Sequence, residues 1–470
     1  MRTVVVGGGL AGVTAALRLA DAGVEVTLLE GRPRLGGEAF SFRRGELTVD
    51  NGQHVFLRCC TAYRGFLDRV DATAATTLQD RLDIPVLAGP GQHAAPVGTE
   101  ARLRRSGLPA PAHLTGALAR YAVLTPMQRL RAVRGALALR RLDPADPALD
   151  TQTLGGYLRR HGQDDATLAG LFDVVGTATL NLPADDASLA LAATVFRTGL
   201  LDQPEAADVG YATAPLGHLH DDLAATALER AGVEVRRATK VDAVGADATV
   251  HLRDGAVLHP DAVVLAVPPE AALGLSPFLP EGIGRLSAAP IVNVHVVYDR
   301  RVTDHEFAAA VGSPVQWVFD RTVSSGLAAG RGPAGSRDGQ YLAVTVSAAF
   351  AEIDEPVDVL RPRFVAALAE LFPRARDAAV LEVFVTRERR ATFRQAPGTA
   401  RLRPGPRVAG SDAVVVAGAW TATGWPDTME SAVRSGHAAA AALLGADPDS
   451  RFAHRGARRP RPSHRAAGAE

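Results

Sequence analysis

The chain has 470 residues, of which 47% are hydrophobic and 22% charged, so it can bury a large core and should hold more than one domain. Its 51 basic and 51 acidic residues balance, which gives no support for nucleic-acid binding. The two cysteines, Cys59 and Cys60, are adjacent and suit neither a disulfide framework nor a zinc site, so we expect a cytoplasmic protein without a metal. We expect neither a signal peptide nor a transmembrane helix, because the chain opens with a strand pattern and no apolar run reaches about 18–20 residues.

A glycine-rich motif near the N-terminus predicts a dinucleotide-binding unit. A hydrophobic run leads into Gly-Gly-Gly-Leu-Ala-Gly at 7–12, an Ala/Leu-rich helical pattern follows, and a second strand pattern ends in an acid. In such a unit the first glycine permits a tight turn, the second lets a pyrophosphate approach the backbone, and the third lets helix and strand pack closely. The helix N-terminus attracts the pyrophosphate, and the acid accepts a hydrogen bond from the ribose. The predicted contacts are Gly7, Gly8, Gly9, Leu10, Ala11, Gly12 and Glu30.

Two further segments indicate that the dinucleotide is FAD. A second glycine pair follows six residues after the acid, at the spacing with which flavoproteins lay the chain along the FAD phosphates. Near the C-terminus a buried strand pattern leads into Gly-Ala-Trp and a helix from about 428 to 444, a segment that in FAD proteins returns to the ribityl chain and the flavin ring. If segments near both ends of the chain contact the same cofactor, that cofactor must be large. The contacts predicted here are Arg34, Gly36, Gly37, Gly418, Ala419, Trp420 and Met429.

The remaining patterns divide the chain into two domains. A helix at 222–231 and strands at 233–235, 239–244, 249–252 and 262–267 return to the cofactor domain, where Val241 would set its backbone against the adenine. We predict an α/β fold with a discontinuous Rossmann-type FAD-binding domain (1–75, 206–277 and 401–445) and a mixed α+β substrate domain (76–205 and 278–400). A second Gly-x-Gly-x-x-Gly at 330–335 lacks a preceding strand and a following helix, so we expect a loop there, and a disordered basic tail at 446–470.

Charge is distributed unevenly along the chain. Nine arginines and no acid lie between 102 and 141, and six arginines and one acid lie between 451 and 470. The end of the first block predicts a helix, with Thr125 as N-cap and Pro126 as its first residue. Its apolar and basic residues are expected on two separate faces, namely Leu130, Val133 and Leu137 on one and Arg131 and Arg134 on the other. Such a helix predicts peripheral docking on an anionic membrane, and the alternative is a helix whose arginines pair with acids elsewhere.

Several longer segments resemble a known family. The overall plan is similar to the amine oxidase and phytoene desaturase flavoproteins, and the segments look like the hydroxysqualene dehydroxylase branch, the squalene-associated FAD enzymes of hopanoid synthesis. The resemblance covers residues 1 to about 445 and implies an FAD-dependent oxidoreductase that converts hydroxysqualene to squalene with electrons from an external donor. The segments are 49–55 (Val-Asp-Asn-Gly-Gln-His-Val), Cys59-Cys60, 181–183, 290–295, 314–321 (Pro-Val-Gln-Trp-Val-Phe-Asp-Arg), 390–393 and 420–424.

Two positions depart from that family's pattern. Ala419 stands where an acid usually bonds a ribityl hydroxyl, and losing a charge-assisted hydrogen bond costs about 1.5–3 kcal/mol. Glu38 stands where an arginine usually follows the glycine pair near the phosphates. Both changes predict weaker FAD binding unless other groups compensate, although they leave the main-chain cradle intact.

The resemblance also implies the chemistry. Protonation of the allylic hydroxyl and loss of water would leave an allylic cation, which hydride from N5 of the reduced flavin could quench. That reaction needs a proton donor near N5, and His54 is the first candidate because histidine titrates near neutral pH, with Asp50 as the second. The alternatives are that His54 bonds the backbone or the flavin without exchanging protons, and that Asp50 is a structural turn residue.

Three other functions stay open on the sequence alone. An amine oxidase would usually carry a lysine that is hydrogen-bonded through water to N5, whereas the single lysine, Lys240, lies in the stretch expected near the adenine. A carotenoid or phytoene desaturase shares the fold and a lipophilic substrate but runs in the oxidative direction. A non-catalytic, FAD-binding lipid-associated protein draws support from Ala419.

Overall fold

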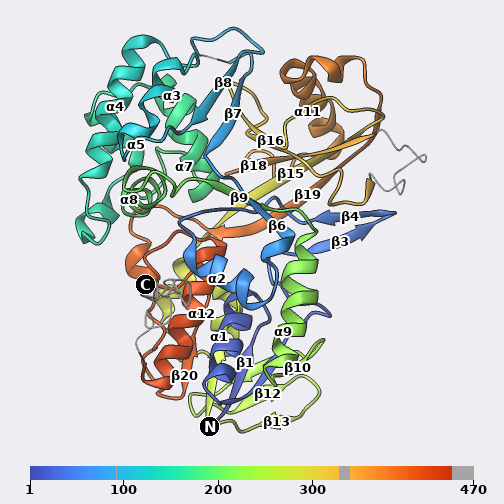
Figure 1. Ribbon diagram of the computed structural model, residues 1–470. Coiled ribbons are helices and arrows are strands. Elements are labelled where there is room, and N and C mark those ends of the chain that lie inside the picture. Colours follow the sequence, from blue (N-terminus) through green and yellow to red (C-terminus); the bar gives the residue numbers. More distant parts are fainter. Residues whose placement is uncertain (92, 328–338, 447–470) are drawn as a thin grey trace, which may run out of the picture.

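A computed structural model describes residues 1–91, 93–327 and 339–446 of the chain. The glycine motif at 330–335 and the tail from 447 onward, both subjects of predictions above, lie outside the described residues. The fold is α/β, as predicted, and Figure 1 shows a lower part that contains the N-terminus and an upper part with a helical lobe beside a large sheet.

A five-stranded parallel sheet forms the centre of the lower part, in the order β10–β2–β1–β14–β20. Side chains alternate between its two faces, so Val5 packs with α1 and α12 on one face while Val4 and Val6 join a core that includes the small sheet β11–β12–β13 on the other. Both faces are therefore buried, which explains why the strands are continuously hydrophobic. The strands span Arg2–Val6 (β1), Glu25–Leu29 (β2), Glu234–Arg236 (β10), Ala262–Leu265 (β14) and Val414–Val416 (β20).

The helices of the lower part pack closely around this sheet. A Cβ added to Gly436 of α12 would lie 2.3 Å from the Ala11 carbonyl oxygen, so the first and last helices of the chain touch backbone to backbone. The helices are α1 (Leu10–Asp21), α2 (Thr61–Arg69), α9 (Ala224–Arg230), α10 (Pro269–Leu275) and α12 (Met429–Leu444). The small strands are β3 (Ser41–Arg44), β4 (Leu47–Asp50), β5 (Val55–Leu57), β6 (Thr76–Leu78), β9 (Val209–Ala212), β11 (Val241–Val244), β12 (Val250–Leu252) and β13 (Val257–Leu258).

A seven-stranded mixed sheet and six helices between residues 115 and 196 form the upper part (Figure 1). The sheet order is β19–β15–β18–β17–β16–β7–β8, with strands Asp83–Ala88 (β7), Glu100–Arg104 (β8), Ala288–Tyr298 (β15), Phe307–Val311 (β16), Trp317–Asp320 (β17), Gln340–Ser347 (β18) and Val380–Phe393 (β19). The helices are α3 (Thr115–Arg120), α4 (Pro126–Arg140), α5 (Leu154–Arg160), α6 (Asp165–Thr167), α7 (Asp173–Leu180) and α8 (Leu189–Phe196), and α11 (Val357–Leu371) packs against the sheet.

Most of the expected elements are present, and the differences are confined to single elements. Thr125 caps α4 with its side chain, and Pro126 is its first residue, as predicted. The helix expected at 222–231 begins as a π-helical segment at His218 and becomes α-helical only at Ala224. Strand β6 lies just past residue 75 but pairs with β9, so the small sheet β5–β9–β6 crosses the expected domain boundary. Within the described residues we find no helix with the length and hydropathy that crossing a bilayer requires.

Candidate functional site

Two glycines of the first loop are required by the fold itself. Gly7 has a φ of 107°, and a Cβ there would lie 2.4 Å from the Ala266 carbonyl oxygen of the neighbouring strand. A Cβ on Gly12 would lie 1.9 Å from the Gly7 carbonyl oxygen. A side chain at Gly7 would push the loop away from the chain after β14, and one at Gly12 would force the strand β1 and the helix α1 apart, so the two glycines set the close packing of these elements.

Gly9 differs from them, because the fold leaves room beside it. Its φ is −75°, and an added Cβ would meet only Gly37, at 3.6 Å from the Cα atom, which is ordinary contact. Helix α1 then begins at Leu10 without a side-chain cap, so the first amide groups of the helix have no side-chain partner. Two glycine loops that face each other in front of an uncapped helix N-terminus fit an anionic group such as a pyrophosphate.

The second glycine pair is fastened to the first loop. The Gly36 amide donates to the Gly8 carbonyl oxygen at 2.9 Å. Arg34 holds the same turn, because its guanidinium donates to the Gly37 carbonyl oxygen at 2.9 Å and lies 3.4 Å from the centre of the Phe40 ring. Burial, together with the nearby Arg32 charge, lowers the pKa of Arg34.

Glu30 fixes the loop by accepting two backbone hydrogen bonds. Its two oxygens take the amides of Gly8 and Arg32, each at 2.7 Å. Carboxylate oxygens each have two lone pairs, so a ribose hydroxyl could still be bound. The chain from Ala238 returns to this segment, since the amide of Thr239 donates to the Glu30 carbonyl oxygen at 2.9 Å. Val241, two residues later, therefore begins β11 close to Glu30.

The C-terminal segment approaches from the other edge of the sheet. Gly418 follows β20 with a φ of 150°, and its amide donates to Ser435 Oγ at 2.8 Å. The Trp420 indole donates to the Val267 carbonyl oxygen at 3.0 Å, which anchors this segment beside the strand β14. Thr428 caps helix α12, which starts at Met429.

A buried arginine, Arg403, supports this segment, and the sequence had not indicated it. It donates to the carbonyl oxygens of Ala419 and Trp420, at 3.0 and 3.3 Å, and its guanidinium lies 5.0 Å from the centre of the Phe393 ring. Burial lowers its pKa to about 10. Arg403 belongs to no motif and precedes Ala419 by 16 residues. Only the fold could therefore reveal its contact with the Gly-Ala-Trp segment.

Two acids at the start of α12 were also missed. Asp427 accepts a hydrogen bond from the Phe393 amide at 2.8 Å, and desolvation by burial raises its pKa to about 6. Glu430 is fully buried and accepts the amides of Ala62 and Tyr63, so it caps α2. Desolvation raises the pKa of Glu430. The Asp-Thr-Met-Glu run was a possible signal, because acids at a helix start satisfy free amides.

The two predicted catalytic residues have different surroundings. Both oxygens of Asp50 are engaged, since one pairs with Arg321 at 2.6 Å and the other accepts from Ser41 Oγ and the Leu216 amide. These contacts favour the structural role of Asp50 over proton donation. His54 lies half-buried with Nδ1 3.2 Å from the Gly52 carbonyl oxygen. Burial lowers its pKa, so the ring is neutral at pH 7, and with Nδ1 donating to Gly52 the lone pair on Nε2 is left as an acceptor.

The segment that carries these two residues joins the two parts of the molecule. Asn51 donates to the Glu38 carbonyl oxygen at 2.9 Å and to the Glu388 carboxylate at 3.1 Å, and its own carbonyl accepts from Asn293 on β15. The Glu38 side chain, which stands where the family has an arginine, lies 3.6 Å from Arg32. Half-exposed pairs of this kind contribute at most about 1 kcal/mol, so Arg32 offsets the Glu38 charge only in part.

These features agree with a comparison of the whole chain with known families. A family model described as flavin containing amine oxidoreductase matches residues 10–444. The chain belongs to this family. It is therefore an FAD-dependent oxidoreductase, and FAD is its cofactor.

Individual relatives of this amine oxidoreductase match it from end to end. The hydroxysqualene dehydroxylase of Rhodopseudomonas palustris is 30% identical and matches 94% of this chain and 98% of its own. That of Sinorhizobium fredii is 29% identical over 93% and 96%. A probable zeta-carotene desaturase of Synechococcus elongatus is 25% identical over 95% and 99%. The resemblance to hydroxysqualene dehydroxylases that the sequence indicated is confirmed.

Solved structures confirm the fold of this amine oxidoreductase. A putrescine oxidase variant superposes with a TM-score of 0.67 at 20% identity, covering 94% of this chain and 98% of the other. An oxidoreductase from Methanosarcina mazei superposes with a TM-score of 0.69 at 15% identity, covering 95% and 100%.

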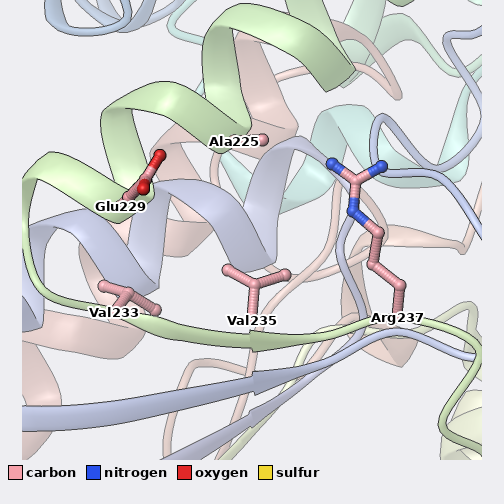
Figure 2. Close-up of a pocket in the computed structure, with 5 residues that line it drawn as sticks. All are labelled: Ala225, Glu229, Val233, Val235 and Arg237. Atoms are coloured by element: carbon pink, nitrogen blue, oxygen red, sulfur yellow. The ribbon is translucent and has the colours of Figure 1, made fainter.

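A shallow hollow between α9 and β10 is separate from the candidate site. Figure 2 shows Val235 pointing from β10 toward α9, with Glu229 and Arg237 at either side. It is lined by Ala225, Glu229, Val233, Val235 and Arg237. None of these five is a predicted cofactor or catalytic residue, so the hollow takes no part in the assignment of the site.

Proposed function

We propose that this FAD-dependent oxidoreductase removes the hydroxyl group of hydroxysqualene to give squalene, as a step of squalene and hopanoid synthesis. The observation that carries the proposal is that two segments resembling hydroxysqualene dehydroxylases, 49–55 and 314–321, meet in the structure. Asp50 from the first and Arg321 from the second form a buried ion pair at 2.6 Å. The relatives of that name, at 29–30% identity over nearly the whole chain, support the same activity.

We propose that FAD lies across the two glycine loops and reaches the start of α12. The uncapped N-terminus of α1 would face the pyrophosphate, Glu30 the ribose, and the segment before α12 the ribityl chain and the ring. The residues in contact would be Gly7, Gly8, Gly9, Leu10, Ala11, Gly12, Glu30, Arg34, Gly36, Gly37, Val241, Gly418, Ala419, Trp420 and Met429. Replacing Gly9 tests this placement, as set out in the Discussion.

Reduced FAD would supply the hydride, and His54 is our proposal for the residue that gives the proton to the departing hydroxyl. The surroundings that lower the pKa of His54 make its protonated form a stronger acid but a scarcer one at pH 7. Turnover should therefore rise as pH falls through the pKa of His54, below its usual value of about 6.5. His54→Gln should lose this rise while still binding flavin. An unchanged pH profile in His54→Gln would leave His54 only a hydrogen-bonding role.

The reaction itself is tested by incubating the photoreduced protein with hydroxysqualene under anaerobic conditions. We expect squalene as the product and no conversion by protein in which the flavin is kept oxidised. The desaturase relative at 25% identity makes a carotenoid desaturase the second candidate. Conversion of phytoene by the oxidised protein, without squalene from the reduced one, would replace our proposal with that function. Flavin that stays bound while neither substrate reacts would indicate a non-catalytic, lipid-associated protein.

We further propose that the enzyme works in the cytoplasm and receives its electrons from an external donor. The adjacent cysteines, Cys59 and Cys60, are free in the structure, which suits a reducing compartment. An isoprenoid substrate would reside in lipid, so the proposal also places the enzyme at the inner face of the membrane.

A further inference from the structure

The solvent-facing side of α4 carries large apolar residues. Met127 and Leu130 are 56% and 65% exposed, and Val133 and Leu137 are 36% and 40% exposed. The side that packs against the protein is built from small residues and one leucine, namely Ala132, Gly135, Ala138 and Leu139. The helix is thus apolar on both sides, with its larger side chains in water. Contiguous exposed apolar groups mark an interaction surface.

Arginines lie on this outer side next to the apolar residues, because Leu130, Val133 and Leu137 occupy one part of it and Arg131 and Arg134 the adjacent part, so both sets are exposed. With about 100° between successive residues of an α-helix, all exposed side chains of α4 and its C-cap fall within an arc of about 160°. The reason is that the inner side is already filled by small residues in close contact with the lobe. We call this exposed set the outer face of α4. It comprises Pro126, Met127, Leu130, Arg131, Val133, Arg134, Leu137 and Arg141.

The arginines of the outer face form no ion pair within the described residues, although the charge of Arg131 contributes to lowering the pKa of Asp164. Of the nine between 102 and 141, four make ion pairs with acids elsewhere (Arg102, Arg104, Arg105 and Arg140). Arg129 donates to the carbonyl oxygens of Ala119 and Leu124. Arg120, Arg131, Arg134 and Arg141 make no ion pair in the described part of the chain. The expected alternative, arginines paired with acids elsewhere, therefore holds for Arg102, Arg104 and Arg105 and for Arg140 at the end of α4. It does not hold for Arg131 and Arg134 of the same helix, which form no ion pair within the described residues.

We propose that the outer face of α4 docks on the surface of an anionic lipid bilayer. Met127, Leu130 and Leu137 would enter the boundary between headgroups and acyl chains, and the arginines beside them would bind lipid phosphates. Charge decides between this occupant and a second copy of the chain. An isologous contact would bring the unpaired arginines of two identical faces together, and that repulsion opposes self-association.

Helix α11 provides a matched control on the same part of the molecule. It has the same length as α4, 15 residues, and also exposes an apolar residue and an arginine, since Val359 is 44% exposed and Arg361 is exposed on the same helix. Unlike α4 it carries an acid in its first turn, Asp358. Substitutions on α11 alter exposed groups of the same type without touching the outer face of α4.

The experiment measures cosedimentation of the full-length, flavin-loaded protein with phosphatidylcholine vesicles that contain or lack phosphatidylglycerol. We expect binding to the anionic vesicles only, weakened by salt. Each arginine at such a surface contributes about 5-fold, so reversing two charges with Arg131→Glu and Arg134→Glu should weaken binding at least about 20-fold. Leu130→Ser with Leu137→Ser should weaken it as well, whereas Val359→Ser with Arg361→Glu should not. All these positions are exposed, so flavin content and thermal unfolding should stay as in the parent.

Depth of insertion gives an independent readout. Leu130→Trp should be quenched by brominated acyl chains in anionic vesicles, and Val359→Trp should not. The proposal fails if the arginine double variant binds as well as the parent, and binding that disappears only when 447–470 is deleted would assign docking to the tail. It also fails if the parent is a dimer that the same variant dissociates, because the outer face would then be a contact between copies. Neither result bears on whether hydroxysqualene is the substrate.

Discussion

The proposed cofactor site has two walls that are built by different means. The N-terminal wall, residues 7–37, is held by backbone contacts, by the Glu30 carboxylate, which accepts two amides, and by the Arg34 guanidinium on the Gly37 carbonyl. The C-terminal wall, residues 403 and 418–430, depends on ionisable side chains, and burial shifts the pKa of Arg403 and of Asp427 toward the neutral form of each. A side chain at Gly7 or Gly12 would clash with the backbone of the first wall, whereas the charged groups of the second wall can be changed without such a clash.

The sharpest test of the first wall is Gly12→Ala. The added Cβ would lie 1.9 Å from the Gly7 carbonyl oxygen, so β1 and α1 cannot keep their crossing. Overpacking of this kind costs about 3 kcal/mol or more, and we expect little soluble protein and a lowered urea midpoint. A variant as stable as the parent would show that the loop can yield.

Gly9→Val tests cofactor binding without disturbing the fold. Its Cβ makes only ordinary contact with Gly37, so the protein should fold normally. The side chain fills the space between the glycine loops, and we expect protein without flavin, measured by absorbance after gel filtration. Yellow protein from this variant would contradict our placement of the pyrophosphate.

On the second wall, Ala419→Asp should restore a hydrogen bond to the ribityl chain. We expect FAD to bind more tightly by about 1.5–3 kcal/mol, measured by titration of the flavin-free protein. Arg403 lies against the same residue and could pair with the new carboxylate, so the gain should be near the lower value. If Arg403 competes for the new carboxylate, adding Arg403→Met to Ala419→Asp should increase the gain in FAD affinity. If neither the single nor the double variant binds FAD more tightly than the parent, another group already satisfies the ribityl hydroxyl.

The smallest expected effect concerns Asp427 and pH. Its pKa is about 6 in the folded protein against 3.8 as a free side chain, so folding favours the protonated form. The stability that this acid contributes is complete below pH 3.8 and is lost as pH rises through 6. Part of the residue remains accessible to water, so Asp427→Asn should stabilise the flavin-free protein by about 1–2 kcal/mol at pH 7 and by little at pH 4.

Urea unfolding of parent and variant at several pH values measures this difference. Buried histidines act in the opposite sense in both proteins, since burial lowers the pKa of His220 to about 4 and acid therefore destabilises the fold. Subtracting the two curves removes that common effect. A variant less stable than the parent at pH 7 would mean that the ionised Asp427 pairs favourably with Arg403.

The sequence alone determined the first wall and the fold around it. The hydrophobic runs at 2–6, 25–29 and 262–265 are buried on both faces, so their pattern is continuous and easily recognised. The glycine spacing is equally informative. The positive φ of Gly7 and the close backbone contact at Gly12 allow almost no residue other than glycine. The start of α4 followed in the same way from its cap, Thr125.

Only the tertiary structure decided which ionisable side chains support the second wall and how α4 is oriented. Arg403, Asp427 and Glu430 act through partners that are distant in sequence or on other elements, and no spacing rule connects Arg403 to Ala419 or Glu430 to Ala62. The periodic apolar residues of α4 indicated a buried or membrane-facing stripe, but which side packs depends on the shape of the neighbouring helices. Small residues allow the closer approach, so Ala132 and Gly135 face inward and Leu130 is left outside. Local sequence patterns determine where helices and strands form. Which charged groups become buried, and which face of a helix packs, depends on the segments that the rest of the fold places next to them.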